Sequence, residues 1–363
     1  MRVLERLDRL YAIGGGPGAN RLGGSAEEDE AHRLVTAWMR EAGLETEVDP
    51  AGNLFGRLRG RQPALPEAWT GSHLDTVPGG GRFDGALGVV AGLEAVARVG
   101  RRDRTLAVLA FRDEEGCGGR GVFGSRALCG GLGEDEAPGL DRGGWLDPRP
   151  ACFIEVHVEQ GPRLERAGAP LAVVTRIAAM ARGEVVFRGR PGHAGTTPMA
   201  ARDDALVEAA AFALRLREAA ASVDGAVATV GRMAVEPGAA NVIPGRVSVS
   251  VDVRAPDAER LGRVLAVVPG ELPAIDAVEM AIEPREALWR EVERLGLPML
   301  ELASGAGHDA GVLAAAGVPT AMLFVRSLNG GISHSPEERS SAEDVERAVA
   351  VLSGALAHFA SVE

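Results

Sequence analysis

The sequence predicts an α/β protein, with a mostly parallel-sheet larger domain interrupted by a smaller inserted α+β domain. In the first half, short apolar runs alternate with helical stretches, as in a parallel sheet covered on both faces. In the middle, apolar and polar residues alternate along the expected strands, which is typical of an antiparallel sheet with one buried face. The α/β pattern then returns, so the chain of 363 residues holds more than one average domain.

The first half contains one amphipathic helix over about 25–42, where Ser25 with Glu28 fits a capping box. The next expected elements are strands at 69–77, 105–111 and 153–158 and a helix at 85–99. Acidic and histidine residues gather where these strands end. Ligand sites of open α/β sheets lie at the carboxyl ends of the strands, so we expect a site there.

The middle of the chain contains Val247, Val249, Val251 and Val253, which alternate with polar residues and predict a strand. The other expected elements here are a strand at 183–188 and helices at 203–220 and 258–267. Two helices on one face of a small antiparallel sheet form an α+β domain. We therefore expect an inserted domain at 179–284 and a larger domain at 1–178 and 285–363.

Composition excludes several classes of function. The formal net charge of −12 argues against a nucleic-acid partner, which requires clustered positive charge. No apolar run approaches the ~20 residues that span a bilayer, and the N-terminus lacks the apolar core of a signal peptide. Three cysteines without CxxC spacing suit a reducing compartment, so we expect a cytoplasmic protein without membrane partners.

The segment GSHLDTVPGGGRFDG contains the first candidate site residues. His73 and Asp75 are two residues apart on an expected strand end, so their side chains share a face. A metal-bound imidazole needs its second ring nitrogen fixed, often by a carboxylate, and Asp75 is placed to do this. Asp84 follows on a glycine-rich turn, where it could bridge two cations, cap a helix, or do both.

The remaining candidates are Glu114, Glu115, His157 and His334. Adjacent carboxylates point in different directions, so one can bind metal while the other holds a proton; surface pairs are usually only solvated. A lone histidine is more often structural than a ligand, so the argument rests on the whole set. The candidate ligands, which suit Zn²⁺, Mn²⁺ or Co²⁺, are His73, Asp84, Glu115, His157 and His334.

Six motifs together resemble the hydantoinase/carbamoylase branch of the M20 metallopeptidase superfamily, nearly from end to end of the chain. They are GSHLDTVPGGGRFDGALGVVAGLE, EVHVEQGP, HAGTTPM, NVIPGRV, SGAGHDA and GGISHSPEE. The branch includes N-carbamoyl-L-amino acid hydrolases, allantoate amidohydrolases and β-ureidopropionases. EVHVEQG is the distinguishing motif, because ordinary M20 peptidases usually have a carboxylate where this chain has His157.

The resemblance implies a metallohydrolase with two divalent ions per subunit. The implied ligands are His73, His157 and Asp84 for one ion, and Glu115, His334 and the same Asp84 for the other. Glu114 would be the general base, and Asp75 would orient His73. His193 would reach the site of a second subunit and stabilise the oxyanion, because the inserted domain of this family acts as a lid and forms a homodimer.

The resemblance also implies a small substrate that bears a carboxylate and a ureido group. Gln160 would contact the ureido group, and Asn241 and Arg254 would bind the carboxylate. Arg254 suits this role because a guanidinium pairs bidentately with a carboxylate. The resemblance implies a structural role for His308 and Asp309. His32 and His358 are expected on helix surfaces.

The function expected from the sequence is metal-dependent hydrolysis of the C–N bond of an N-carbamoyl-L-amino acid or allantoate-type substrate, with release of ammonia and CO₂. One alternative is an M20-type aminoacylase or dipeptidase that cleaves a true amide bond. Another is a non-catalytic metal- or partner-binding relative, against which the presence of Glu114 speaks. Segments 117–121 and 128–150 depart from the family pattern and could reshape the substrate pocket.

Overall fold

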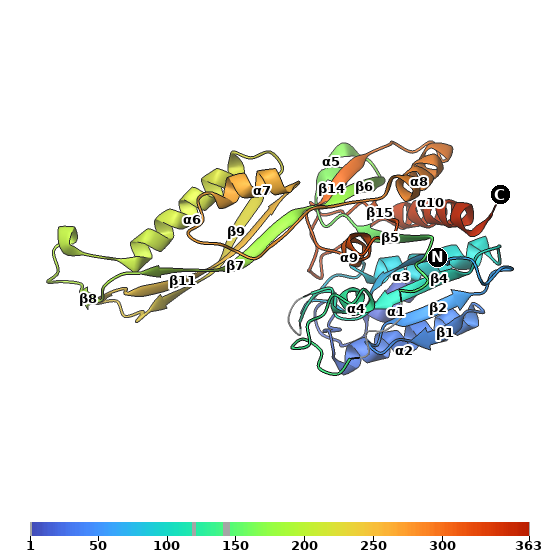
Figure 1. The fold of residues 1–363 in the computed structure, drawn as a ribbon, viewed down its shortest axis with the longest axis horizontal. Helices are drawn as coiled ribbons and strands as arrows, with labels where there is room; N and C mark the ends of the chain where they lie inside the picture. The colour runs from blue at the N-terminus through green and yellow to red at the C-terminus, as the bar shows by residue number, and fades with distance from the viewer. Residues whose placement is uncertain (1, 118–120, 141–145, 363) are drawn as a thin grey trace. The chain divides into compact units, whose positions relative to one another are not determined.

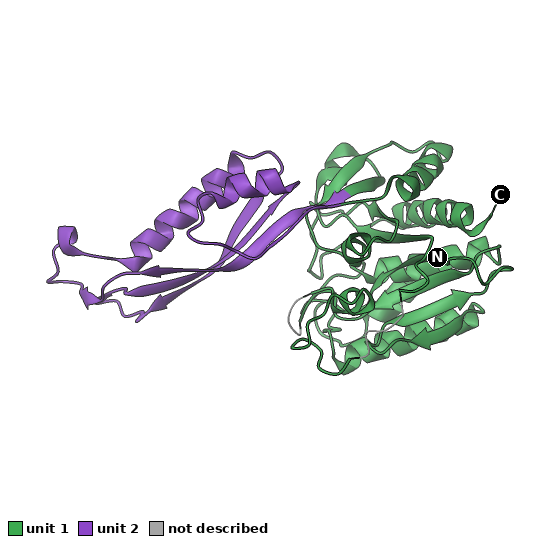
Figure 2. Ribbon diagram, in the orientation of Figure 1, with its two compact units in different colours: residues 1–175, 279–363 green, residues 176–278 purple. Residues whose placement is uncertain are grey.

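The computed structural model describes residues 2–117, 121–140 and 146–362. The chain forms two compact units, residues 1–175 with 279–363 and residues 176–278 (Figure 2). The second unit is an insertion in the first; the sequence placed the inserted domain at 179–284. The two segments that depart from the family pattern, 117–121 and 128–150, lie partly outside the described residues.

Unit 1 is built on one mixed sheet (Figure 1), whose strand order among the described residues is β1-β2-β4-β3-β5-β15-β6-β13, with β14 paired to β6. The strands are β1 (Glu45–Val48), β2 (Leu54–Leu58), β3 (Ala68–His73), β4 (Leu106–Phe111), β5 (Cys152–Val158), β6 (Leu171–Ile177), β13 (Val278–Glu279), β14 (Glu301–Ser304) and β15 (Thr320–Val325). The central strands β4, β3, β5 and β15 are parallel. Strand β1 is antiparallel to β2, β2 is antiparallel to β4, and β6 is antiparallel to β15. The predicted parallel core of the sheet is confirmed, and its strands β3, β4 and β5 are buried along their whole length.

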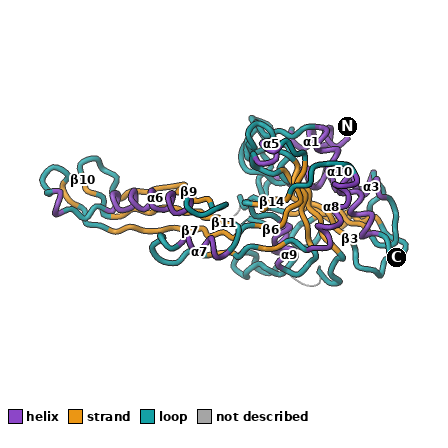
Figure 3. The backbone as a smooth tube through the Cα atoms, turned by 90° about the horizontal axis from the view of Figure 1, so that it is seen from above, coloured by secondary structure: helices purple, strands orange, loops and turns teal. Residues whose placement is uncertain are grey.

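The helices of unit 1 are α1 (Arg2–Tyr11), α2 (Ala26–Glu41), α3 (Ala86–Val99), α4 (Phe123–Leu128), α5 (Arg163–Ala167), α8 (Ile282–Arg294), α9 (Asp309–Ala315) and α10 (Ala342–Ala360). Helices α1, α2, α3, α8 and α10 bury one large apolar core against the strands. Helices α3, α8 and α10 lie side by side along the strands (Figure 3). Helices α4 and α9 contact each other, and α9 also contacts β5 and β15. This packing fixes the strand ends on which the site residues lie.

Helix α2 begins as the sequence predicts, but only half of the expected capping box forms. Ser25 Oγ accepts a hydrogen bond from Glu28 N at 3.2 Å. The Glu28 carboxylate does not return to Ser25; it accepts hydrogen bonds from Gly24 N at 2.7 Å and Asp113 N at 3.1 Å. Glu28 is therefore a buried link between α2 and the loop after β4.

Unit 2 is an antiparallel sheet packed against two helices. Its strands are β7 (Ala179–Arg188), β9 (Val227–Glu236), β11 (Arg246–Ala255) and β12 (Ala274–Ile275), in the order β12-β7-β11-β9, and its helices are α6 (Ala205–Ala221) and α7 (Ala258–Leu265). The four valines at 247, 249, 251 and 253 are buried with Phe212 and Leu216 of α6. The predicted α+β character is confirmed. A short pair, β8 (Gly192–His193) and β10 (Val242–Ile243), adds a second small sheet.

No helix among the described residues is long and apolar enough to cross a membrane.

Candidate metal centre

The candidate ligands of unit 1 gather at the carboxyl end of the parallel strands. His73 ends β3, Glu114 and Glu115 follow β4, and His157 lies in β5, which pairs with β3. Asp84 precedes α3, whose N-cap residue is Gly85 and has no side-chain cap. A Cβ on Gly85 would lie 2.4 Å from the His73 ring, and the φ of Gly85 is +60°, so glycine is required there. The Asp84 side chain therefore does not cap α3, which was one of the roles that the sequence left open for this residue.

The two oxygens of Asp84 face different groups of ligands. Oδ1 lies 3.1 Å from His157 Nε2 and 3.7 Å from His73 Nε2. Oδ2 lies 3.3 Å from His334 Nε2, and that nitrogen is also 3.3 Å from Glu115 Oε1. Each group brings three potential ligand atoms within 4.8 Å of one another. A carboxylate placed in this way can bridge two cations.

The tautomers of the buried histidines test whether the site fits a metal. His157 Nδ1 lies 2.9 Å from the Val158 carbonyl, and His73 Nδ1 lies 3.2 Å from the Asp75 carbonyl. Because a carbonyl only accepts, each Nδ1 carries the proton, and in a neutral ring the Nε2 lone pair faces the carboxylates. A lone pair that faces a carboxylate oxygen is stabilised by a proton or a metal cation between the two atoms. The nitrogen and oxygen ligands therefore fit divalent zinc, manganese or cobalt.

The raised pKa values of His73, His157 and His334 also indicate that the site stabilises positive charge. Burial acts to lower the pKa of His73, but the charges of Glu114, Asp75 and Asp84 raise it well above its usual value. Burial likewise opposes protonation of His157, and Asp84 raises its pKa. Hydrogen bonds with Asp84 and Glu115 raise the pKa of His334 to about 10. A bound divalent cation would replace these protons.

Asp75 positions three site residues rather than the one expected from the sequence. Its carboxylate lies 3.3 Å from His73 Nδ1. The same carboxylate accepts hydrogen bonds from the backbone N–H groups of Glu114 and Glu115, both at 3.0 Å. Glu114 Oε2 lies 3.7 Å from His73 Nε2, and burial, followed by the charges of Asp309 and Glu115, raises the pKa of Glu114 well above its usual value. Glu114 thus points at the centre and holds a proton readily.

Gln160 and His334 both lie beside Asp84 and both have left-handed backbones. Their φ angles are +56° and +53°, a conformation that non-glycine residues rarely adopt. Gln160 Nε2 donates to Asp84 Oδ2 at 2.8 Å and lies 3.4 Å from His334 Nε2. The structure therefore brings Gln160 into the ligand cluster itself.

The three other predicted site residues lie in unit 2. His193 pairs with Val242 across the β8–β10 ladder, and Ala194 N donates to the Asn241 carbonyl, so His193 and Asn241 are neighbours. Arg254 lies on β11, where Nε and a terminal nitrogen donate to the two oxygens of Asp252 at 2.9 and 3.1 Å.

A second group of buried polar residues lies next to the centre; from the sequence, a structural role was expected for His308 but none was assigned to Glu155. Glu155 accepts hydrogen bonds from Ser72 Oγ at 2.6 Å and from Ala310 N at 2.9 Å. The His308 ring stacks edge-on against His157, and its Nε2 is 2.8 Å from Ser304 Oγ. These hydrogen bonds link β3, β5 and α9. Glu155, His157 and His308 also lie close enough together to hold a metal ion. The only sequence signal was their place in the EVHVEQG and SGAGHDA motifs.

Asp309 provides a test of this buried network through the pH dependence of stability. Burial and the charge of Glu155 raise the pKa of Asp309 to about 8, while an unfolded aspartate titrates near 3.9. Between these values the unfolded chain binds fewer protons than the folded chain, so stability falls as pH rises. The Tm of the metal-free wild type should therefore fall between pH 5 and pH 8. We expect a smaller fall in Asp309→Asn.

The matched control is Asp224→Asn, because Asp224 is exposed. Thermal unfolding of the wild type and both variants at several pH values gives the comparison. If the Tm of Asp309→Asn ran parallel to that of the wild type, Asp309 would not carry this titration.

One expectation from the sequence was wrong. His32 is only 7% exposed. It lies beside Glu28 on the side of α2 that contacts Arg112 and Asp113, after β4, and not on the surface.

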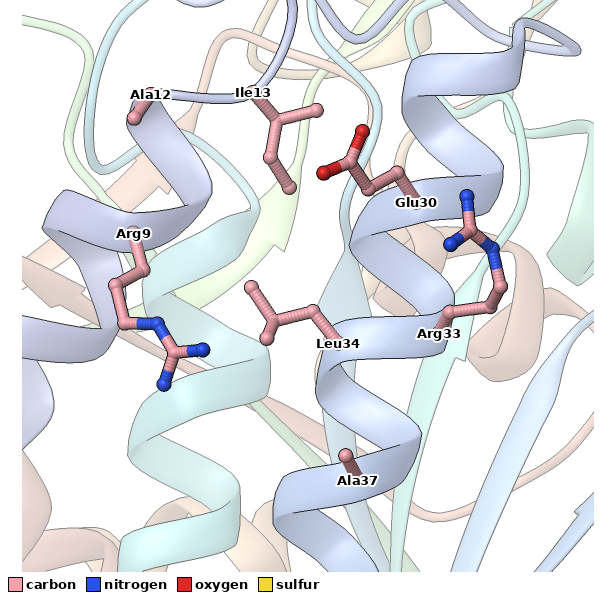
Figure 4. A pocket seen from close by; sticks show the side chains of 7 residues that line it. All are labelled: Arg9, Ala12, Ile13, Glu30, Arg33, Leu34 and Ala37. Atoms are coloured by element: carbon pink, nitrogen blue, oxygen red, sulfur yellow. The ribbon is translucent and has the colours of Figure 1, made fainter.

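A shallow cavity of about 500 Å³ lies between α1 and α2 (Figure 4). Its lining residues are Arg9, Ala12, Ile13, Glu30, Arg33, Leu34 and Ala37. It has a single carboxylate and no imidazole or thiol, so it is not a metal site.

Comparison with known proteins agrees with this fold. Residues 69–358 match the model of peptidase family M20/M25/M40, and the chain belongs to this family. Within the family it falls in the hydantoinase/carbamoylase branch, as the following relatives show. An amidase of that branch from Burkholderia multivorans has a solved structure with a TM-score of 0.84 and 31% identity, over 99% of this chain and 97% of the other.

Two curated relatives also match over nearly their whole length. The N-carbamoyl-L-amino acid amidohydrolase of Geobacillus stearothermophilus is 38% identical over 94% of each chain. The allantoate amidohydrolase of Escherichia coli K12 is 33% identical over 96% of this chain and 95% of the relative. The aminopeptidase PepT of Bacillus cereus, at 17% identity and a TM-score of 0.69, shares the fold.

Proposed function

We propose that the protein is a metal-dependent amidohydrolase that cleaves the C–N bond of an N-carbamoyl-L-amino acid or of an allantoate-type ureido substrate. The observation that carries this proposal is Asp84, whose two oxygens face two separate sets of ligands. The similarity to carbamoylases and allantoate amidohydrolases over nearly the whole chain supports the class of substrate.

The residues that would hold the ions are those gathered around Asp84. His73, His157 and Asp84 would bind one ion, and Glu115, His334 and Asp84 the other. Two divalent ions bound there would supply hydroxide near neutral pH and polarise the substrate carbonyl.

Glu114 would act as the general base and then as the general acid. Its carboxylate points at the centre, and the two hydrogen bonds from the 114 and 115 backbone to Asp75 hold it there. It would accept a proton from the attacking water and return it to the amino-acid nitrogen as the C–N bond breaks. The remaining carbamate would decompose to CO₂ and ammonia.

Four further roles belong to the same proposal. Gln160 lies beside Asp84 and would contact the ureido group. His193 would stabilise the developing oxyanion, and Asn241 and Arg254 would bind the substrate carboxylate. We also propose that the protein forms a homodimer and acts in the cytoplasm; both proposals rest on the family motifs and the composition.

A substrate panel tests this proposal. It contains several N-carbamoyl-L-amino acids, N-carbamoyl-β-alanine, allantoate and a dipeptide, each with protein reloaded with Mn²⁺, Co²⁺ or Zn²⁺. We expect ammonia release from one class of ureido substrate and no cleavage of the dipeptide. Release of amino acids from the dipeptide alone would instead establish the aminoacylase or dipeptidase alternative.

A further inference from the structure

Glu338 is a buried carboxylate in the loop after His334, with a side chain directed at the turn that bears Asp84. It is 5% exposed. Its Oε2 accepts hydrogen bonds from Phe83 N at 2.6 Å and Asp84 N at 3.1 Å, and its Oε1 accepts one from Ser333 Oγ at 2.8 Å. Glu338 thus joins two segments that are 254 residues apart in sequence.

The turn before Asp84 is shaped around this carboxylate. A Cβ on Gly81 would lie 2.1 Å from Glu338 Oε2, so any side chain at Gly81 would displace the carboxylate. Glycine at this position allows the close approach that the two backbone hydrogen bonds require. The position of Asp84 therefore depends on Glu338 as well as on the strand ends.

Ser333 has one hydroxyl proton and two carboxylates within reach. Its Oγ lies 2.8 Å from Glu338 Oε1 and 3.1 Å from Asp84 Oδ2. Asp84 Oδ2 already accepts a hydrogen bond from Gln160. A carboxylate oxygen has two lone pairs, so a second hydrogen bond from Ser333 would leave none for a cation.

We propose that Glu338 is a positioning residue for the metal position formed by Asp84, Glu115 and His334. It anchors the backbone of Asp84. It also accepts the hydrogen bond of the Ser333 hydroxyl, so that Asp84 Oδ2 keeps a lone pair for the ion. The inference rests on the proposed two-metal function and deepens it, because it assigns selective control of one of the two ions to a residue outside the ligand set.

Titration of metal-free protein with Co²⁺, followed by visible absorbance and calorimetry, tests the proposal without relying on activity. In Glu338→Gln the amide would donate to Ser333 Oγ and turn the serine proton towards Asp84. We expect the first Co²⁺ to bind as in the wild type and the second to bind about 10- to 100-fold more weakly, the usual loss for residues that orient ligands. Adding Ser333→Ala to this variant should restore part of the second affinity.

Two further variants make the test specific. Glu337→Gln makes the same change at the adjacent exposed residue and should bind both ions as the wild type does. Gly81→Ala displaces the Glu338 carboxylate while keeping its charge, and should weaken the second ion even if Glu338→Gln does not fold.

Three results would overturn the inference: wild-type affinities in Glu338→Gln or Gly81→Ala, an equal loss of both ions, or no recovery in the double variant. Failure of the wild type itself to bind a second Co²⁺ would instead refute the two-metal centre, so the two proposals fail in distinguishable ways.

Discussion

Glu114→Gln is expected to lower kcat by about 10³-fold or more while the protein keeps its full complement of metal. General acid–base residues typically contribute about 10²- to 10⁴-fold, and here one group is proposed to make both proton transfers. Glutamine fills the same space but cannot accept the proton. Glu114 is not one of the groups that face Asp84, so its loss should leave the ligand set intact.

The measurement pairs the rate of ammonia release with metal analysis of the same sample. Glu41→Gln, at the exposed end of α2, provides the matched control and should behave as the wild type. Turnover within a few-fold of the wild type in Glu114→Gln would refute the proposed base. Loss of metal together with activity would show that Glu114 acts as a ligand.

Asp84→Asn is expected to lose both ions and all measurable turnover. Asparagine presents one acceptor oxygen and one N–H₂ donor, so it cannot face both ligand groups with acceptors. The change also removes a negative charge that lies 3.1 Å from His157 Nε2 and 3.3 Å from His334 Nε2. We expect a loss of metal affinity well beyond the ~10- to 100-fold that follows removal of a residue that only orients ligands.

Misfolding is not expected to account for this loss. Helix α3 has Gly85 as its N-cap residue and receives no side-chain cap, so the helix does not depend on the Asp84 carboxylate. Circular dichroism and the Tm of the metal-free variant should therefore stay close to those of metal-free wild type. A normal Co²⁺ stoichiometry in Asp84→Asn would contradict a shared bridging ligand.

The sequence predicted the parts of the fold that hydrophobic periodicity controls. The buried strands β3, β4 and β5 and the helix α3 were expected within a few residues of their bounds. The antiparallel strands β1 and β2 were not expected, because strands of four or five residues are too short to show a clear periodicity. Strand β9 was also missed, since most of its side chains are partly or fully exposed.

The sequence also predicted which residues of unit 1 gather in space, although the roles assigned to them stay predictions. The residues around Asp84 come from strand ends that a parallel sheet must bring together. The contacts that support these residues could not be predicted, because they join positions far apart in the sequence. Glu338 reaches Phe83, and Ser125 Oγ donates to Asp309 at 2.6 Å across 184 residues. No local sequence pattern predicts such pairs. Likewise, no local pattern predicts that the Glu28 carboxylate accepts a hydrogen bond from Asp113 N instead of from Ser25 N.

The most direct test of a two-metal amidohydrolase is titration of metal-free protein with Mn²⁺ while ammonia release from its best ureido substrate is followed. The proposed site predicts no turnover without metal and full turnover only once two equivalents are bound. Turnover in metal-free protein, or a maximum at one equivalent, would contradict a centre in which Asp84 serves two ions.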